Sequence, residues 1–64
     1  MKRRALIRHL RDKGCLLVRE GGRHSWWQNA DASRRSAVPR HTEIVDQLVR
    51  KICKDLGIEP PTAT

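Results

Sequence analysis

Apolar residues recur at helical spacing near the start of the chain. Between residues 2 and 13, Leu6, Ile7 and Leu10 form an apolar stripe, and arginines occupy another face. This spacing predicts an amphipathic helix. Gly14 follows at the position where a left-handed residue commonly ends a helix. Because the stripe is narrow, we expect this helix to pack on a sheet.

A second amphipathic pattern occupies the C-terminal third of the chain. Two series of apolar residues recur there at every fourth position: Ile44, Leu48, Ile52 and Leu56, and Val45, Val49 and Cys53. We expect this helix to begin between Thr42 and Asp46, with one of these two side chains as its N-terminal cap. Gly57 is expected to end it.

The middle of the chain contains three short segments with the composition of strands. They cover residues 15–19, 24–29 and 34–38. Gly21 and Gly22 mark the first connection as a tight turn, and the polar residues 30–33 suit a hairpin. Pro39 is expected to stop the third strand, because proline cannot donate to a sheet ladder. In a regular second strand Trp26 and Trp27 point to opposite faces, and we expect Trp27 to face the core.

The order helix-strand-strand-strand-helix predicts an α+β fold. Three antiparallel strands can bury one face under two helices, which is the α-β-β-β-α layout of double-stranded-RNA-binding domains. A chain of 64 residues allows one domain. We expect this domain to cover residues 1–58 and to be followed by a disordered tail over residues 59–64. The layout alone does not give a function.

The charge of the chain points to a polyanionic partner. Fourteen Lys and Arg residues oppose seven Asp and Glu residues, a formal net charge of +7, and eleven of the fourteen lie in the first 40 positions. Such a basic excess favours binding to nucleic acid. No apolar run is long enough to span a membrane and no secretion signal is evident, so we expect a cytoplasmic protein without a membrane partner.

His24 is the leading candidate for a catalytic residue. It follows Gly22 and Arg23 and opens the second predicted strand. The glycine allows a phosphate backbone to approach closely, Arg23 adds a positive charge, and Ser25 adds a hydroxyl group. Histidine side chains exchange protons near neutral pH, and RNA carries its own nucleophile, the 2′-hydroxyl. A base with cationic stabilisation can therefore cleave RNA. The residues alone leave open a turn histidine held by hydrogen bonds.

The rest of the chain offers little other chemistry. The seven acidic residues are scattered and no zinc-ligand spacing occurs, so we expect no metal and no small-molecule cofactor. Cys15 and Cys53 lie within apolar runs and are expected to be buried thiols. Arg40 and His41 are the nearest candidates to assist His24. We expect Gly22, Arg23, Ser25 and Arg40 to bind the RNA.

Four stretches of the chain, in order, match a known pattern: MKRRALIRHLRDKGC, REGGRHSWW, AVPRH and VRKICKDLGI. Together they resemble the HicA-type toxins, the HicA/YcfA-like family of mRNA interferases, and the resemblance covers roughly Met1 to Pro60. The family's catalytic histidine falls on His24, and its aromatic residue three positions later falls on Trp27. Two positions depart from the commoner pattern: Arg23 stands where a small polar residue is frequent, and Gln47 where glycine is frequent.

The resemblance implies a specific fold, activity and partner. The fold is the double-stranded-RNA-binding-like α-β-β-β-α arrangement. The activity is that of a toxin of a type II toxin–antitoxin system, an endoribonuclease that cleaves mRNA without the ribosome. The scattered acidic residues separately favour a metal-independent reaction. The partner is a HicB-type antitoxin that covers the histidine. The alternative is a non-catalytic basic module that binds RNA or DNA, and His24 in its glycine context separates the two readings because a pure binder needs no base there.

Overall fold

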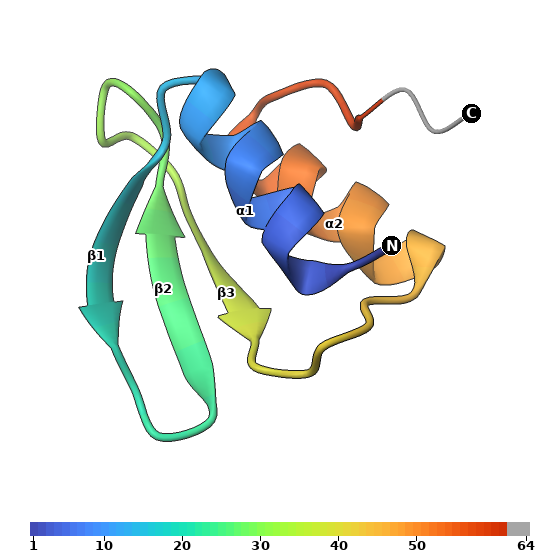
Figure 1. Cartoon of the computed structure of the whole chain (residues 1–64). Coiled ribbons are helices and arrows are strands. Elements are labelled where there is room, and N and C mark those ends of the chain that lie inside the picture. The colour runs from blue at the N-terminus through green and yellow to red at the C-terminus, as the bar shows by residue number, and fades with distance from the viewer. Residues whose placement is uncertain (62–64) are drawn as a thin grey trace.

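The computed structural model, described over residues 1–61, contains two helices and three strands. In chain order they are α1 (Arg3–Asp12), β1 (Leu16–Glu20), β2 (His24–Gln28), β3 (Arg35–Pro39) and α2 (Asp46–Leu56). The strands form one antiparallel sheet in the order β1-β2-β3, and both helices lie on the same side of it (Figure 1). This confirms the predicted α+β fold of the double-stranded-RNA-binding type.

The core lies between the helices and one face of the sheet. Its buried members are Leu6, Leu10, Cys15, Trp27, Val38, Ile44, Val49, Ile52, Cys53 and Leu56. Both cysteines are buried as predicted, and burial raises the pKa of each thiol. Trp27 is 3% exposed and faces the core, also as predicted, whereas Trp26 is 40% exposed. The guanidinium group of Arg11 covers the Trp27 ring at 5.4 Å from its centroid.

The two helices end as predicted, and α2 begins at Asp46, within the predicted range, but it is not capped as predicted. Gly14 (φ +84°) and Gly57 (φ +69°) follow the helices in the left-handed conformation. At the start of α2, the preceding residue Val45 is extended and its side chain makes no capping hydrogen bond. The prediction that Thr42 or Asp46 caps this helix is therefore wrong.

Backbone pairing explains the missing cap. The amide of Arg3 donates to the carbonyl of Thr42 (2.8 Å), and the amide of Ile44 donates to the carbonyl of Met1 (2.8 Å). The segment before α2 is thus extended along the N-terminus, and Thr42 lies too far from the first turn of the helix to cap it. The start of the helix is held by this pairing instead.

The third strand reaches one residue further than predicted. Pro39 belongs to β3 and pairs with His24 of β2. An edge strand tolerates a proline, because its outer side has no ladder to which an amide must donate. The pairing matters for the site, since it sets His24 beside the last residue of β3.

The end of the described chain lies against α1. The Nε2 atom of His9 makes a hydrogen bond with the carbonyl of Glu59 (2.7 Å). Of the tail predicted to be disordered over residues 59–64, residues 62–64 lie outside the described residues. No helix within residues 1–61 is long and apolar enough to cross a membrane.

Candidate active site

His24 lies at the open face of the sheet. It is the first residue of β2, and burial alternates along this strand: His24 and Trp26 are exposed, and Ser25 and Trp27 are buried against the helices. The carbonyl of His24 accepts a hydrogen bond from the amide of Gly21 (2.8 Å). With Pro39 of β3 paired on the other side, the backbone of the histidine is held by the β1–β2 connection and by β3, while its side chain is exposed.

The two glycines before His24 have different roles. A Cβ atom at Gly21 would lie 3.0 Å from the carbonyl oxygen of His24, so this position must be small for the hairpin to close. A Cβ atom at Gly22 would meet nothing within 4 Å. Gly22 therefore leaves open space beside the exposed side chains of Arg23 and His24, which is the arrangement that close approach of a phosphate backbone requires.

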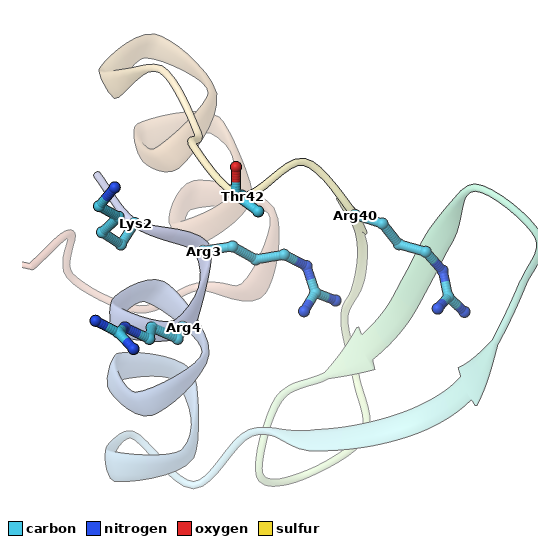
Figure 2. A pocket seen from close by; sticks show the side chains of 5 residues that line it. All are labelled: Lys2, Arg3, Arg4, Arg40 and Thr42. Carbon is cyan, nitrogen blue, oxygen red and sulfur yellow. The ribbon is translucent and has the colours of Figure 1, made fainter.

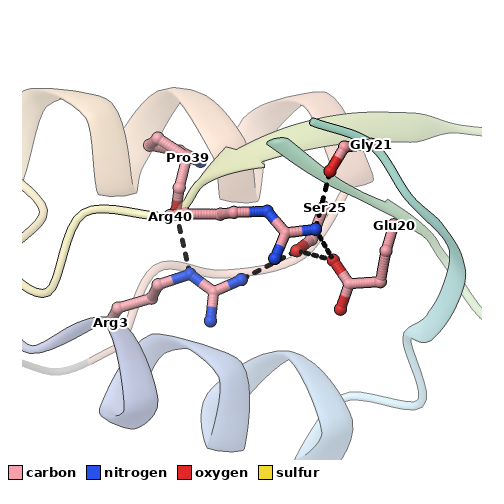
Figure 3. Close-up of polar contacts among 6 residues, drawn as sticks. All are labelled: Arg3, Glu20, Gly21, Ser25, Pro39 and Arg40. Atoms are coloured by element: carbon pink, nitrogen blue, oxygen red, sulfur yellow. Dashed lines mark hydrogen bonds and ion pairs between the residues drawn. The ribbon is translucent and has the colours of Figure 1, made fainter. Parts of the chain in front are cut away.

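A polar network surrounds the buried hydroxyl group of Ser25 (Figure 3). The Nη2 atom of Arg3 donates to Ser25 Oγ (2.8 Å), and that hydroxyl donates to Glu20 Oε1. The same Glu20 oxygen accepts a hydrogen bond from Arg40 Nη2 at 2.8 Å. Arg40 Nη2 also donates to the carbonyl of Gly21 (2.6 Å). Four separate segments of the chain thereby meet at one point.

Three residues of this network touch the backbone of His24: Pro39 and Gly21 through pairing, and Ser25 as the next residue in the chain. Arg3 also donates from Nε to the carbonyl of Pro39 (2.8 Å), the residue paired with His24. Gly21 and Ser25, the other two members in contact with the histidine backbone, are bound by Arg40 and Arg3. The network therefore fixes the hairpin end from which the imidazole projects.

The four residues predicted from the sequence to bind RNA differ in their exposure to solvent. Gly22, Arg23 and Arg40 are exposed, whereas Ser25 is 1% exposed and its hydroxyl is engaged by Arg3 and Glu20. Sequence reasoning missed Arg3, which reads there as one of a run of basic residues. Its role depends on Ser25 and Pro39, which are distant in the sequence, and no local signal marks it.

A cationic pocket lies beside this network (Figure 2). It has a volume of about 420 Å³ and is lined by Lys2, Arg3, Arg4, Arg40 and Thr42. The first three come from the start of α1 and the residue before it, and the other two from the segment after β3. The lining contains no carboxylate. The arrangement suits an anion such as a phosphate group.

Carboxylates outside the lining neutralise part of the positive charge of this pocket, because Arg40 is paired with Glu20 and Lys2 with Glu43. Glu43 binds the N-terminal amine (3.1 Å) and Lys2 (3.4 Å). Hydrogen bonds from the amine and then from Lys2 lower the pKa of its carboxyl group. Among the described residues, Arg4 forms no ion pair with a carboxylate. Arg4 therefore offers an uncompensated positive charge at the pocket.

No metal-binding cluster occurs in the part of the chain that the structure describes. Within residues 1–61, no three His, Cys, Asp or Glu side chains come together in a way that could hold an ion. The metal-free reaction expected from the sequence stays a prediction, which a chelator can test.

Comparison with known families identifies one match. The family model for the HicA toxin of bacterial toxin–antitoxin systems matches residues 3–58, which include the hairpin, His24 and the network around Ser25. No curated protein and no solved structure matches the chain. The family match confirms the resemblance seen in the sequence.

The Ser25 network generates a prediction about stability. Ser25→Ala removes a buried partner of both Arg3 and Glu20, and we expect it to lower the free energy of unfolding by about 1–3 kcal/mol. Ser33→Ala, whose hydroxyl group makes only solvent-exposed hydrogen bonds with Asn29 and Asp31, is the control. It should lower the free energy of unfolding by less than Ser25→Ala does, because water can replace those partners. Urea unfolding followed by circular dichroism measures both. Equal losses from the two variants would show that the network does not stabilise the fold.

Proposed function

The chain belongs to the HicA toxin family, and from this premise we propose that it is an endoribonuclease that cleaves mRNA without the ribosome. Membership makes it the toxin of a toxin–antitoxin pair, so its biological partner is an antitoxin. We propose that this partner is a HicB-type protein that covers His24. The observation that carries the proposal is the exposed side chain of His24 at the open face of the sheet, on a backbone paired with Gly21 and Pro39.

The proposed reaction uses the nucleophile that RNA itself supplies. His24 accepts the proton of a 2′-hydroxyl group as the 2′-oxygen forms a bond to the adjacent phosphorus. The bond from phosphorus to the 5′-oxygen breaks, and that oxygen takes up a proton. We assign to Arg23, the exposed neighbour of His24 in the chain, the stabilisation of the negative charge that builds on the phosphate. Gly22 leaves room for the backbone of the substrate.

The cationic pocket supports a path for the RNA backbone. Arg3 contacts Pro39, and Pro39 pairs with His24, so the pocket and the histidine lie at the same end of the sheet. We assign the pocket to a phosphate group of a nucleotide that flanks the cleaved bond. Arg40 belongs both to this pocket and to the network around Ser25. Ser25 acts in this proposal through Arg3 and Glu20, because its hydroxyl group is buried.

The first prediction of the proposal concerns His24. His24→Ala should fold normally, because the side chain is exposed, and should lower the rate of RNA cleavage by a factor of about 10²–10⁴. It should still bind the antitoxin and should no longer arrest growth when expressed in a bacterium. His9→Ala, which alters a histidine on α1 rather than on the sheet, is the control and should remain toxic.

Two results would reject this assignment. Undiminished cleavage by His24→Ala would exclude His24 as the base. Tight RNA binding by the wild-type chain without any cleavage would favour the non-catalytic binding module instead.

A second prediction concerns the cationic pocket. Arg4→Ala removes a phosphate contact, so the slope of log K against log salt for binding single-stranded RNA should fall by about 0.7 in magnitude. Arg8→Ala, one turn along α1 and exposed but outside the pocket, should leave the slope unchanged. Titrations at several salt concentrations measure both. If the two variants change the slope equally, the pocket is not a specific phosphate site.

A third prediction concerns metal ions. If His24 and the 2′-hydroxyl group supply the chemistry, cleavage should continue at an unchanged rate in excess chelator. A gel assay of RNA cleavage with and without the chelator measures this rate. Complete loss of cleavage, restored by adding a divalent cation, would overturn the metal-free mechanism.

A further inference from the structure

Trp26 is a large aromatic residue on the open face of the sheet. Its side chain is 40% exposed, although the neighbouring Trp27 fills the core at 3% exposure. Side chains two residues apart on a strand project to the same side, so Trp26 and His24 share this face of β2. The two positions lie about 7 Å apart along the strand, at ~3.4 Å per residue. An exposed tryptophan thus stands next to the proposed base.

A bulge in β1 shapes the surface around Trp26. Leu17 pairs with Trp27 and Arg19 pairs with Trp26, so Val18 is an extra residue in β1 at this point. A bulge of this kind sets two residues of one strand opposite a single residue of its partner. Val18 and Arg19 consequently both lie opposite Trp26, and Arg35 approaches from β3. These four residues line a hollow of about 200 Å³.

The positive charge around this hollow indicates which kind of ligand it can bind. Neither Arg19 nor Arg35 forms an ion pair with a carboxylate within residues 1–61. The indole ring therefore lies among guanidinium groups whose charge is not compensated by the protein. An aromatic surface flanked by free positive charge complements a nucleobase with its phosphates. This surface does not complement a basic protein segment, because like charges would repel. A purely apolar segment would leave the charges of Arg19 and Arg35 without partners.

We propose that Val18, Arg19, Trp26 and Arg35 form a stacking subsite for one unpaired base of the RNA substrate, next to the cleaved bond. The proposal rests on the proposed function and deepens it, because it names the form of the substrate. In a paired A-form helix the faces of the bases are stacked on one another and are not available to a side chain. The RNA therefore enters as a single strand, although the fold has the layout of a double-stranded-RNA-binding domain.

Intrinsic fluorescence provides a direct test that does not depend on cleavage. The probe is a short single-stranded 2′-O-methyl RNA, which has no free 2′-hydroxyl group and stays intact. Binding to the wild-type chain should quench the emission of Trp26, and the fully paired duplex of the same sequence should quench it much less. Trp26→Leu keeps Trp27 as a reporter; its emission should not respond, and affinity for the single strand should fall on the order of 10-fold.

Matched variants separate stacking from a general apolar contact. Trp26→Phe keeps an aromatic face and should retain most of the affinity. Leu16→Ala, which alters another exposed apolar residue of the sheet, should bind the single strand as the wild type does. Thermal unfolding of each variant verifies that it is folded. Loss of affinity in Trp26→Leu, with affinity retained in the other two variants, supports the subsite.

Two results would overturn the subsite: equal quenching by duplex and single strand, and unchanged affinity for the single strand in Trp26→Leu. If that variant keeps its RNA affinity and loses antitoxin binding, the hollow belongs to the antitoxin. The same titration of His24→Ala distinguishes the stacking subsite from the catalytic role of His24. It should be quenched like the wild type, whereas continued cleavage of ordinary RNA by that variant would overturn the catalytic assignment alone.

Discussion

The hydroxyl group of Ser25, held between Arg3 and Glu20, is the contact on which the proposed site depends. A buried hydroxyl without partners costs about 1–3 kcal/mol, a large share of the stability of a small domain. Through Arg3, the first turn of α1 contacts this hydroxyl group. Through Glu20, the end of β1 contacts it as well, and Glu20 also binds Arg40. The hairpin and the helix are therefore held in one arrangement, and His24 projects from the place where they meet.

In strand β2, alternate side chains serve the stability of the fold and the proposed chemistry. Its buried positions, Ser25 and Trp27, join the network and the core, and its exposed positions, His24 and Trp26, carry the proposed base and the proposed stacking surface. A shift of one residue in register would exchange the two sets. The burial of Trp27 opposes that shift. A chain with one thin core can in this way present a reactive group without building an enclosed active site.

The sequence predicted the parts of this account that depend on local pattern. Periodicity located both helices and the core, the left-handed glycines located both helix ends, and alternation placed Trp27 inside. The cap of α2 could not be predicted, because Thr42 is used in backbone pairing with Arg3. The role of Arg3 depends on Ser25, 22 positions away, and the difference between Gly21 and Gly22 depends on the closure of the hairpin. These are tertiary relationships, which composition and spacing do not encode.

In the proposed reaction, His24 activates the 2′-hydroxyl group of the RNA rather than a water molecule. The chemical ends of the products report this choice most directly. Mass spectrometry of a short RNA of known sequence, cleaved by the purified chain, should find a 2′,3′-cyclic phosphate on the upstream fragment and a 5′-hydroxyl group on the downstream fragment. A 3′-hydroxyl group paired with a 5′-phosphate would exclude this reaction, because those ends arise when water attacks the phosphorus and the 3′-oxygen leaves.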